Sequence, residues 1–146
     1  MWRAPTEQDL QISISQTEME SFRSAATADV MQDTVASMLA RTTSLVRGYC
    51  RANPRIRLGP SGTIPEGLMA AAMDYTAVDV VKRTPSGVSE ERRRARETAL
   101  QMFRDVAEGK MLVESYGVPD DAAAGSSVEV ADSSRQRFTP DELKGL

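Results

Sequence analysis

The chain has 146 residues, of which 40% are hydrophobic, and its formal net charge is −3. This length predicts one domain with room for a tail, and the negative charge excludes a polycation that binds DNA through charge alone. The sequence has no histidine, which removes the usual general base and metal ligand, and its single cysteine, Cys50, excludes an intrachain disulfide.

Apolar runs in the sequence are short and interrupted by charged residues. A membrane helix needs roughly 20 consecutive apolar residues, and a signal peptide also needs an unbroken apolar core. The sequence therefore predicts neither, and one unpaired cysteine fits a reducing compartment. Eight methionines and many alanines favour a helical core.

Two short helices are predicted at the N-terminus. Thr6, preceded by Pro5, has the character of an N-cap. Ser15 and Glu18 have the spacing of a capping box, in which each side chain accepts from the other residue's amide. We expect a second helix from Gln16 to Ala25.

A long amphipathic helix is predicted from Val30 to Ala52, with Asp29 as its N-cap. Its apolar positions recur every three or four residues, and Thr42 fills one gap in that pattern. The helix must end at Asn53-Pro54, because the residue before proline is pushed out of the helical region.

The next segment, Arg55 to Ile64, contains two glycines and a proline and is predicted to be a loop. Pro65 suits the first position of a following helix, where its missing N–H costs nothing. That helix, Pro65 to Lys82, is apolar nearly all round, which predicts a central buried helix.

A charged helix is predicted after the turn at Thr84–Gly87, with Ser89 as its N-cap and Gly109 as its C-terminal glycine. Its apolar stripe consists of Ala95, Ala99, Met102 and Val106, with Phe103 at the edge.

The arginines of this helix do not form one basic face. Acidic residues lie at helical spacing from several of them, as in the pairs Glu90–Arg94, Arg93–Glu97 and Arg104–Glu108. This pattern favours a solvated or subunit-facing surface. The alternative is a helical nucleic-acid-binding regulator that uses Arg92 to Arg96.

A sharper basic feature lies between Asp33 and Glu66, where no acidic residue occurs. One interpretation is pairing within the monomer, including pairing with Asp74 or Asp79. The other is a positive patch that meets an acidic partner subunit or DNA. The candidate residues for such electrostatic contacts are Arg41, Arg47, Arg51, Arg55 and Arg57.

The composition changes at Gly117, so we expect two parts: a helical body at 1–116 and an extended tail at 117–146. The tail holds three basic and six acidic residues and has no periodic apolar face until Thr139, which can cap a terminal turn. A docking tail and a frayed terminus both fit this pattern.

No catalytic constellation is evident, so we do not expect an enzyme. Cys50 has no histidine partner, and residues 59–62 lack the lysine of a phosphate-binding loop. Asp74 and Asp79 fall on different helix faces, so they do not converge. The sequence predicts no catalytic, cofactor-binding or metal-binding residue.

In order and spacing, these features resemble the head-to-tail connector (adaptor) proteins of tailed phages, especially the Mu-like head-completion type. The most telling segments are AEGKM at 107–111 and the ending RQRFTPDELKGL at 135–146. The chain departs from the family in its acidic insert, Pro119 to Ser134, and in the loop after Asn53. The resemblance implies an all-α fold, a small bundle of about four to five helices with an extended C-terminal tail.

The resemblance also implies a structural role in the virion neck, after assembly in the host cytoplasm. Such adaptors form a homo-oligomeric ring, commonly twelvefold, beneath the portal protein. The ring extends the DNA channel, with DNA only as cargo, and carries the stopper or tail-completion protein. No membrane and no cofactor is implied. The residues implied to dock on the portal or a neighbour are Arg137, Phe138, Leu143 and Leu146.

Overall fold

The computed structural model describes residues 1–28 and 34–117, and the helices and strands of these residues lie in the first of two units, Met1–Tyr116. The α-helices are α1 (Glu7–Leu10), α2 (Gln16–Ala28), α3 (Val35–Ala52), α4 (Met69–Val81) and α5 (Glu90–Ala107). Two short strands, β1 (Trp2–Arg3) and β2 (Ile64–Pro65), pair antiparallel. The prediction of an all-α bundle of four to five helices is confirmed for this unit, whereas the predicted tail lies outside the described residues beyond Gly117.

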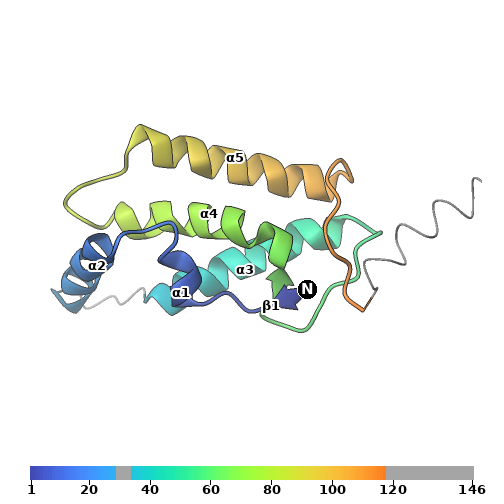
Figure 1. Ribbon diagram of the computed structural model, residues 1–146, viewed down its shortest axis with the longest axis horizontal. Helices are drawn as coiled ribbons and strands as arrows, with labels where there is room; N and C mark the ends of the chain where they lie inside the picture. The colour runs from blue at the N-terminus through green and yellow to red at the C-terminus, as the bar shows by residue number, and fades with distance from the viewer. Residues whose placement is uncertain (29–33, 118–146) are drawn as a thin grey trace, which may run out of the picture. The chain divides into compact units, whose positions relative to one another are not determined.

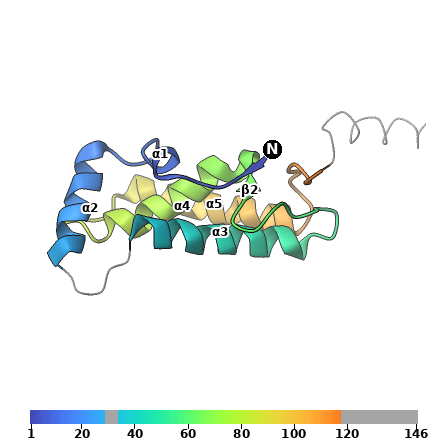
Figure 2. The same cartoon turned by 90° about the horizontal axis from the view of Figure 1, so that it is seen from below.

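Helix α4 is the centre of the fold, as its composition predicts. It packs against α5 and α3 and also contacts α1 and α2 (Figures 1 and 2). Nine of its thirteen residues are buried. None of the described helices is long and apolar enough to cross a membrane.

Phe103 joins α3, α4 and α5. It is fully buried, with its ring centroid 5.9 Å from that of Tyr49 in α3 and 6.3 Å from that of Tyr75 in α4. The predicted stripe on α5 is therefore displaced. Phe103 is its centre, whereas Ala95 and Met102 are only half-buried.

The polar gap at Thr42 also has a structural reason. The Thr76 hydroxyl of α4 lies 2.7 Å from Thr42 Oγ1 and 2.8 Å from the Ala72 carbonyl oxygen. Both threonines are buried, so this contact satisfies polar groups that would otherwise be costly to desolvate.

The predicted helix boundaries are confirmed where the capping residue and its hydrogen-bond partner are close neighbours in the sequence. Thr6 forms a capping box with Asp9, and Ser15 forms one with Glu18. Ser89 accepts from the Arg92 amide, and Gly109 has a positive φ of 76° at the end of α5. These local hydrogen bonds need no tertiary partner, which is why the sequence predicts them.

Three predicted boundaries are wrong. Helix α3 begins at Val35, because Thr34 has extended backbone and accepts from the Ser37 amide, so Thr34 and not Asp29 is its N-cap. Asp29 itself lies outside the described residues. Helix α2 continues to Ala28, three residues past the predicted end at Ala25.

The third error concerns Pro65. It belongs to β2, opposite Trp2, and a 3₁₀ turn at Glu66–Leu68 precedes α4. Proline tolerates an edge strand because it has no N–H to donate.

Candidate functional site

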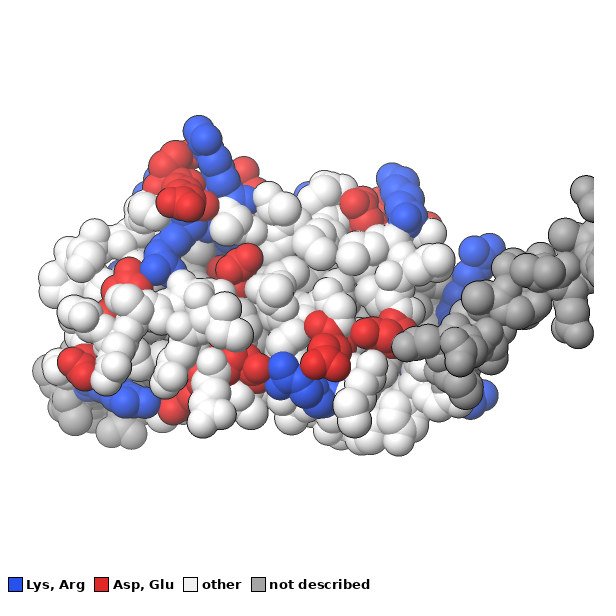
Figure 3. Space-filling view, in the orientation of Figure 1, with Lys and Arg blue, Asp and Glu red and all other residues white. Residues whose placement is uncertain are grey.

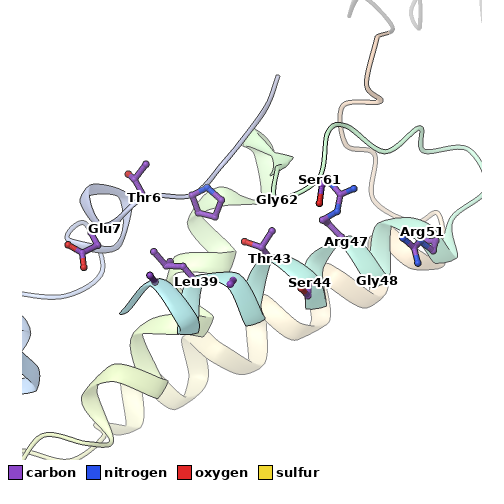
Figure 4. A pocket seen from close by; sticks show the side chains of 13 residues that line it. Thr6, Glu7, Leu39, Thr43, Ser44, Arg47, Gly48, Arg51, Ser61 and Gly62 are labelled. Atoms are coloured by element: carbon purple, nitrogen blue, oxygen red, sulfur yellow. The ribbon is translucent and has the colours of Figure 1, made fainter. Parts of the chain in front are cut away.

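An open groove runs along the exposed side of α3 and is called the α3 groove here. It has a volume of about 700 Å³ and lies between α3, the start of α1 and the loop after α3 (Figure 4). Thr6 and Glu7 lie at the α1 side, and Ser61 and Gly62 at the loop side. Its α3 wall consists of Ala36, Leu39, Ala40, Thr43, Ser44, Arg47, Gly48 and Arg51.

The exposed floor of the α3 groove consists of small residues. Ala36, Ala40, Ser44 and Gly48 recur every four positions and are all exposed. A Cβ atom added at Gly48 would meet no other atom within 4 Å. Such a row lets another backbone approach closely, because no long side chain stands in the way.

Arg47, one of the predicted electrostatic residues, is turned towards its own chain. Its Nη1 donates to the carbonyl oxygens of Pro60 and Thr63, each at 2.8 Å, and its Nη2 donates to that of Gly59 at 3.1 Å. The guanidinium also lies 5.8 Å from the centre of the Trp2 ring. Arg47 therefore holds the loop after α3 and has little left to offer a partner.

The other predicted arginines of this region, Arg41, Arg51, Arg55 and Arg57, are exposed. Three of them lie at the C-terminal end of α3 or just beyond it. Within the described chain, the guanidinium groups of Arg51, Arg55 and Arg57 form no ion pair. The interpretation of pairing with Asp74 or Asp79 is wrong for these three, because Asp74 accepts from Ser13 and Asp79 pairs with Lys82 and Arg96.

The loop that carries Arg55 and Arg57 is anchored by side-chain and backbone bonds. Asn53 Nδ2 donates to the Val106 carbonyl oxygen at 2.8 Å, and Asn53 Oδ1 accepts from the Arg55 amide at 3.0 Å. The Arg57 amide donates to Ser115 Oγ at 2.7 Å, and its carbonyl accepts from the Tyr116 amide at 2.9 Å. The two exposed arginines thus stand on a fixed backbone.

Trp2 is a structural residue that sequence reasoning missed. It is buried against Gly59, where an added Cβ would lie 2.9 Å from Trp2 atoms, and its Nε1 donates to the Glu114 carbonyl oxygen at 2.7 Å. A two-residue strand gives no periodic signal. The only hint is a lone tryptophan beside the N-terminus, together with a glycine in a distant loop.

The arginines of α5 are engaged within the body. Arg92 donates to the Ser13 carbonyl oxygen at 2.8 Å and to Glu18 at 2.7 Å. Arg96 lies 3.2 Å from Asp79 and stacks over Tyr75 at 4.3 Å. Arg94 pairs with Glu90 at 3.7 Å, as predicted from their spacing.

These contacts argue against the nucleic-acid interpretation of Arg92 to Arg96. Phosphate binding would have to compete with the carboxylates that already hold three of the four arginines. Figure 3 shows basic and acidic side chains next to each other on the face formed by α1, α4 and α5, without a continuous basic surface.

Cys50 is fully buried, and this burial raises the pKa of its thiol to about 11. The thiol therefore stays protonated at neutral pH, where a nucleophile or metal ligand needs the thiolate. Among the described residues, no group of three or more cysteines or acidic residues could hold a metal ion.

The four predicted docking residues of the tail, Arg137, Phe138, Leu143 and Leu146, lie outside the described residues. Their role stays a prediction.

Comparison with known families gives a match over most of the chain. The model of the family described as Bacteriophage Mu, Gp36 matches residues 5–132, which include every α-helix of the described chain. The match stops before the ending at 135–146 and so includes none of the four predicted docking residues. No curated protein and no solved structure matches the chain.

Proposed function

The chain belongs to the bacteriophage Mu Gp36 family, and from this premise we propose that it is a structural protein of the virion neck, a head-to-tail adaptor. In this role, copies of the chain form a ring under the portal, extend the DNA channel and provide the surface on which the stopper or tail-completion protein assembles. The observation that carries the proposal is the family match over most of the chain.

The build of the described body supports a role in packing. It is a small helical unit with a long helix face, the α3 groove, left uncovered. A ring needs each copy to offer two different surfaces, one to each neighbour. Arg51, Arg55 and Arg57 are exposed on fixed backbone, so they can contact a neighbour or the portal without a further loss of backbone freedom.

We further propose that the chain is not an enzyme. The buried Cys50 thiol is protonated, and the sequence has no histidine. Asp74 and Asp79 already have partners within the body. The function then depends on fitted surfaces rather than on bond-making groups.

The C-terminal segment is proposed to dock on the portal or on a neighbouring copy. Phe138 and Leu143 supply apolar anchors in an otherwise acidic segment, and Arg137 adds a positive charge beside them. Segments of this composition commonly order when they bind.

The proposal is tested with a phage that lacks this gene, complemented by the full chain. We expect its heads to contain DNA and portal but to lack tails, and the wild-type chain to restore joining. The double variant Phe138→Ala/Leu143→Ala should bind portal-bearing heads more weakly, whereas Val128→Ala/Val130→Ala, in the same segment, should bind normally. Normal joining of heads and tails without the chain would contradict the adaptor role.

A further inference from the structure

Charge is divided unevenly over the described body. Residues 34–65, which comprise α3 and the loop after it, hold five arginines and no acidic residue. Residues 1–28 and 66–117 hold ten basic and thirteen acidic side chains, a net charge of −3. The segment that forms the α3 wall of the groove is therefore positive, and the one acidic residue that lines the groove, Glu7, is paired with Arg23 at 3.2 Å.

A second, smaller hollow lies on the negative part and is called the acidic hollow here. It has a volume of about 250 Å³. It is lined by Ser13, Asp74, Ala77, Ser89, Glu91, Arg92 and Ala95.

The charge available to a partner in the acidic hollow is negative. Arg92 is occupied by Ser13 and Glu18, and Asp74 keeps its carboxylate half-buried with Ser13 as its hydrogen-bond donor. Glu91 is exposed in the first turn of α5, and in the described part of the chain it has no ion-pair partner.

We propose that the α3 groove of one copy binds the first turn of α5 and the acidic hollow of a second copy, with Arg51 facing Glu91 and Asp74. The inference rests on the proposed function and deepens it, because it names the two surfaces that meet in the ring. The occupant is a second copy because the negative surface that complements the groove lies on the same chain.

The geometry supports a heterologous contact, in which two different surfaces of neighbouring copies meet. The α3 groove is built from α1, α3 and the loop at 61–62, whereas the acidic hollow is built from α4, α5 and Ser13, so the two hollows share no helix. A contact between two different surfaces leaves one of each free on every pair, and repetition of that contact closes a ring or extends a filament. A contact between identical surfaces would stop at a dimer.

The shape of the α3 groove favours a helix turn over a nucleic acid. The row Ala36, Ala40, Ser44 and Gly48 leaves space for a backbone along the helix. Only two arginines line this groove, and the loop carbonyls already occupy Arg47. A duplex would instead need several free cations along its phosphates.

The experiment uses the full chain with charge reversals on each surface, Arg51→Glu and Glu91→Arg. Self-association is measured by sedimentation velocity over a concentration series and by native mass spectrometry, at low and high salt. We expect each single variant to associate at least about tenfold more weakly than the wild type, because like charges then face each other. High salt should weaken the wild-type contact.

An equimolar mixture of the two variants should associate again. The intact acidic hollow of Arg51→Glu meets the intact groove of Glu91→Arg, and the two reversed surfaces complement each other. Arg104→Glu and Glu97→Arg are matched controls, because both residues are exposed on α5 and line neither hollow. They should associate like the wild type, and urea unfolding checks that every variant is folded.

Three results would overturn the inference: single variants that associate like the wild type, a mixture that stays dissociated, or a wild-type chain that is monomeric at every concentration. Retention of the wild type on duplex DNA at low salt, lost in Arg51→Glu while self-association is unchanged, would assign the groove to nucleic acid instead. If the wild type forms rings and both variants do so equally, only this inference fails. If copies never associate, alone or on portal-bearing heads, the proposed function fails as well.

Discussion

The arginines of α5 and those of the α3 region are similar in number but differ in surroundings. Arg92, Arg94 and Arg96 each contact a carboxylate of the same body. Arg51, Arg55 and Arg57 stand in a region without acidic residues and are exposed. The position of the carboxylates thus decides whether an arginine is paired within its own chain or is exposed to a partner. The α5 arginines, which stand closer together in the sequence, are the paired ones.

Arg47 lies in the α3 region but, unlike Arg51, it is bonded to its own chain. Its substitution is expected to have the largest effect on stability. Arg47→Met removes three hydrogen bonds from a charged group to the carbonyls of Gly59, Pro60 and Thr63. We expect the free energy of unfolding to fall by about 2–3 kcal/mol, because the three bonds are charge-assisted and two of them are partly buried. Urea unfolding measures it. The matched control is Arg51→Met, one turn further along α3, which should change stability by less than about 0.5 kcal/mol. Equal losses in both variants would show that the contacts of Arg47 with the loop carbonyls add nothing to stability.

Arg92 tests the structural role of the α5 cluster. Arg92→Met separates the start of α5 from Ser13 and leaves Glu18, which is 23% exposed, without its cation. We expect a loss of about 2 kcal/mol in the free energy of unfolding. Arg93→Met, at an exposed neighbouring position, should be close to neutral. A neutral Arg92→Met would mean that the α5 arginines are not needed for folding.

The Arg3–Asp9 pair allows the contribution of an arginine–carboxylate pair to stability to be measured through its pH dependence. Two bonds of 2.8 Å join the guanidinium to the carboxylate, and they hold the pKa of Asp9 well below its usual range. Because the folded pKa is lower than the unfolded value of about 3.9, the charged form contributes stability above about pH 4, and this contribution is lost as the pH falls.

Asp9→Asn should therefore lower the free energy of unfolding by about 1 kcal/mol at pH 7. Its stability should also fall less steeply than that of the wild type between about pH 4 and pH 2. Thermal unfolding across this pH series measures both effects. Parallel pH profiles for the two proteins would show that the pair contributes nothing through charge.

The smallest effect is expected for the exposed arginines of the loop. Arg55→Gln and Arg57→Gln should each change the free energy of unfolding by less than about 0.5 kcal/mol, because their guanidinium groups form no ion pair in the described part of the chain. Urea unfolding checks this. A loss of more than about 1 kcal/mol in the free energy of unfolding would show that these side chains stabilise the fold, as Arg92 is expected to do.

Much of the helical fold could be predicted. The N-cap at Thr6, the capping box at Ser15, the caps at Ser89 and Gly109 and the buried α4 follow from residues within a turn of each other or from one strongly apolar segment. The misplaced start of α3 shows the limit of this reasoning, since Asp29 and Thr34 are both acceptable caps by residue type. Only the chain around Thr34 decides between them.

The candidate surfaces were less predictable. The sequence singled out five arginines between Asp33 and Glu66, but it could not separate Arg47 from Arg51, because their difference depends on loop carbonyls twelve to sixteen residues away. Nor could it place Trp2 on Gly59, or bring Asp74 and Glu91 to one hollow.

The sequence by itself determined which segments are helical, most of their local caps, the buried centre and the absence of acidic residues along α3, because each depends on neighbours along the chain. The tertiary structure decided which arginines are bonded within the chain and which remain exposed. A guanidinium finds its partner in space, and the carboxylates and carbonyls that hold Arg92, Arg96 and Arg47 come from other segments of the chain.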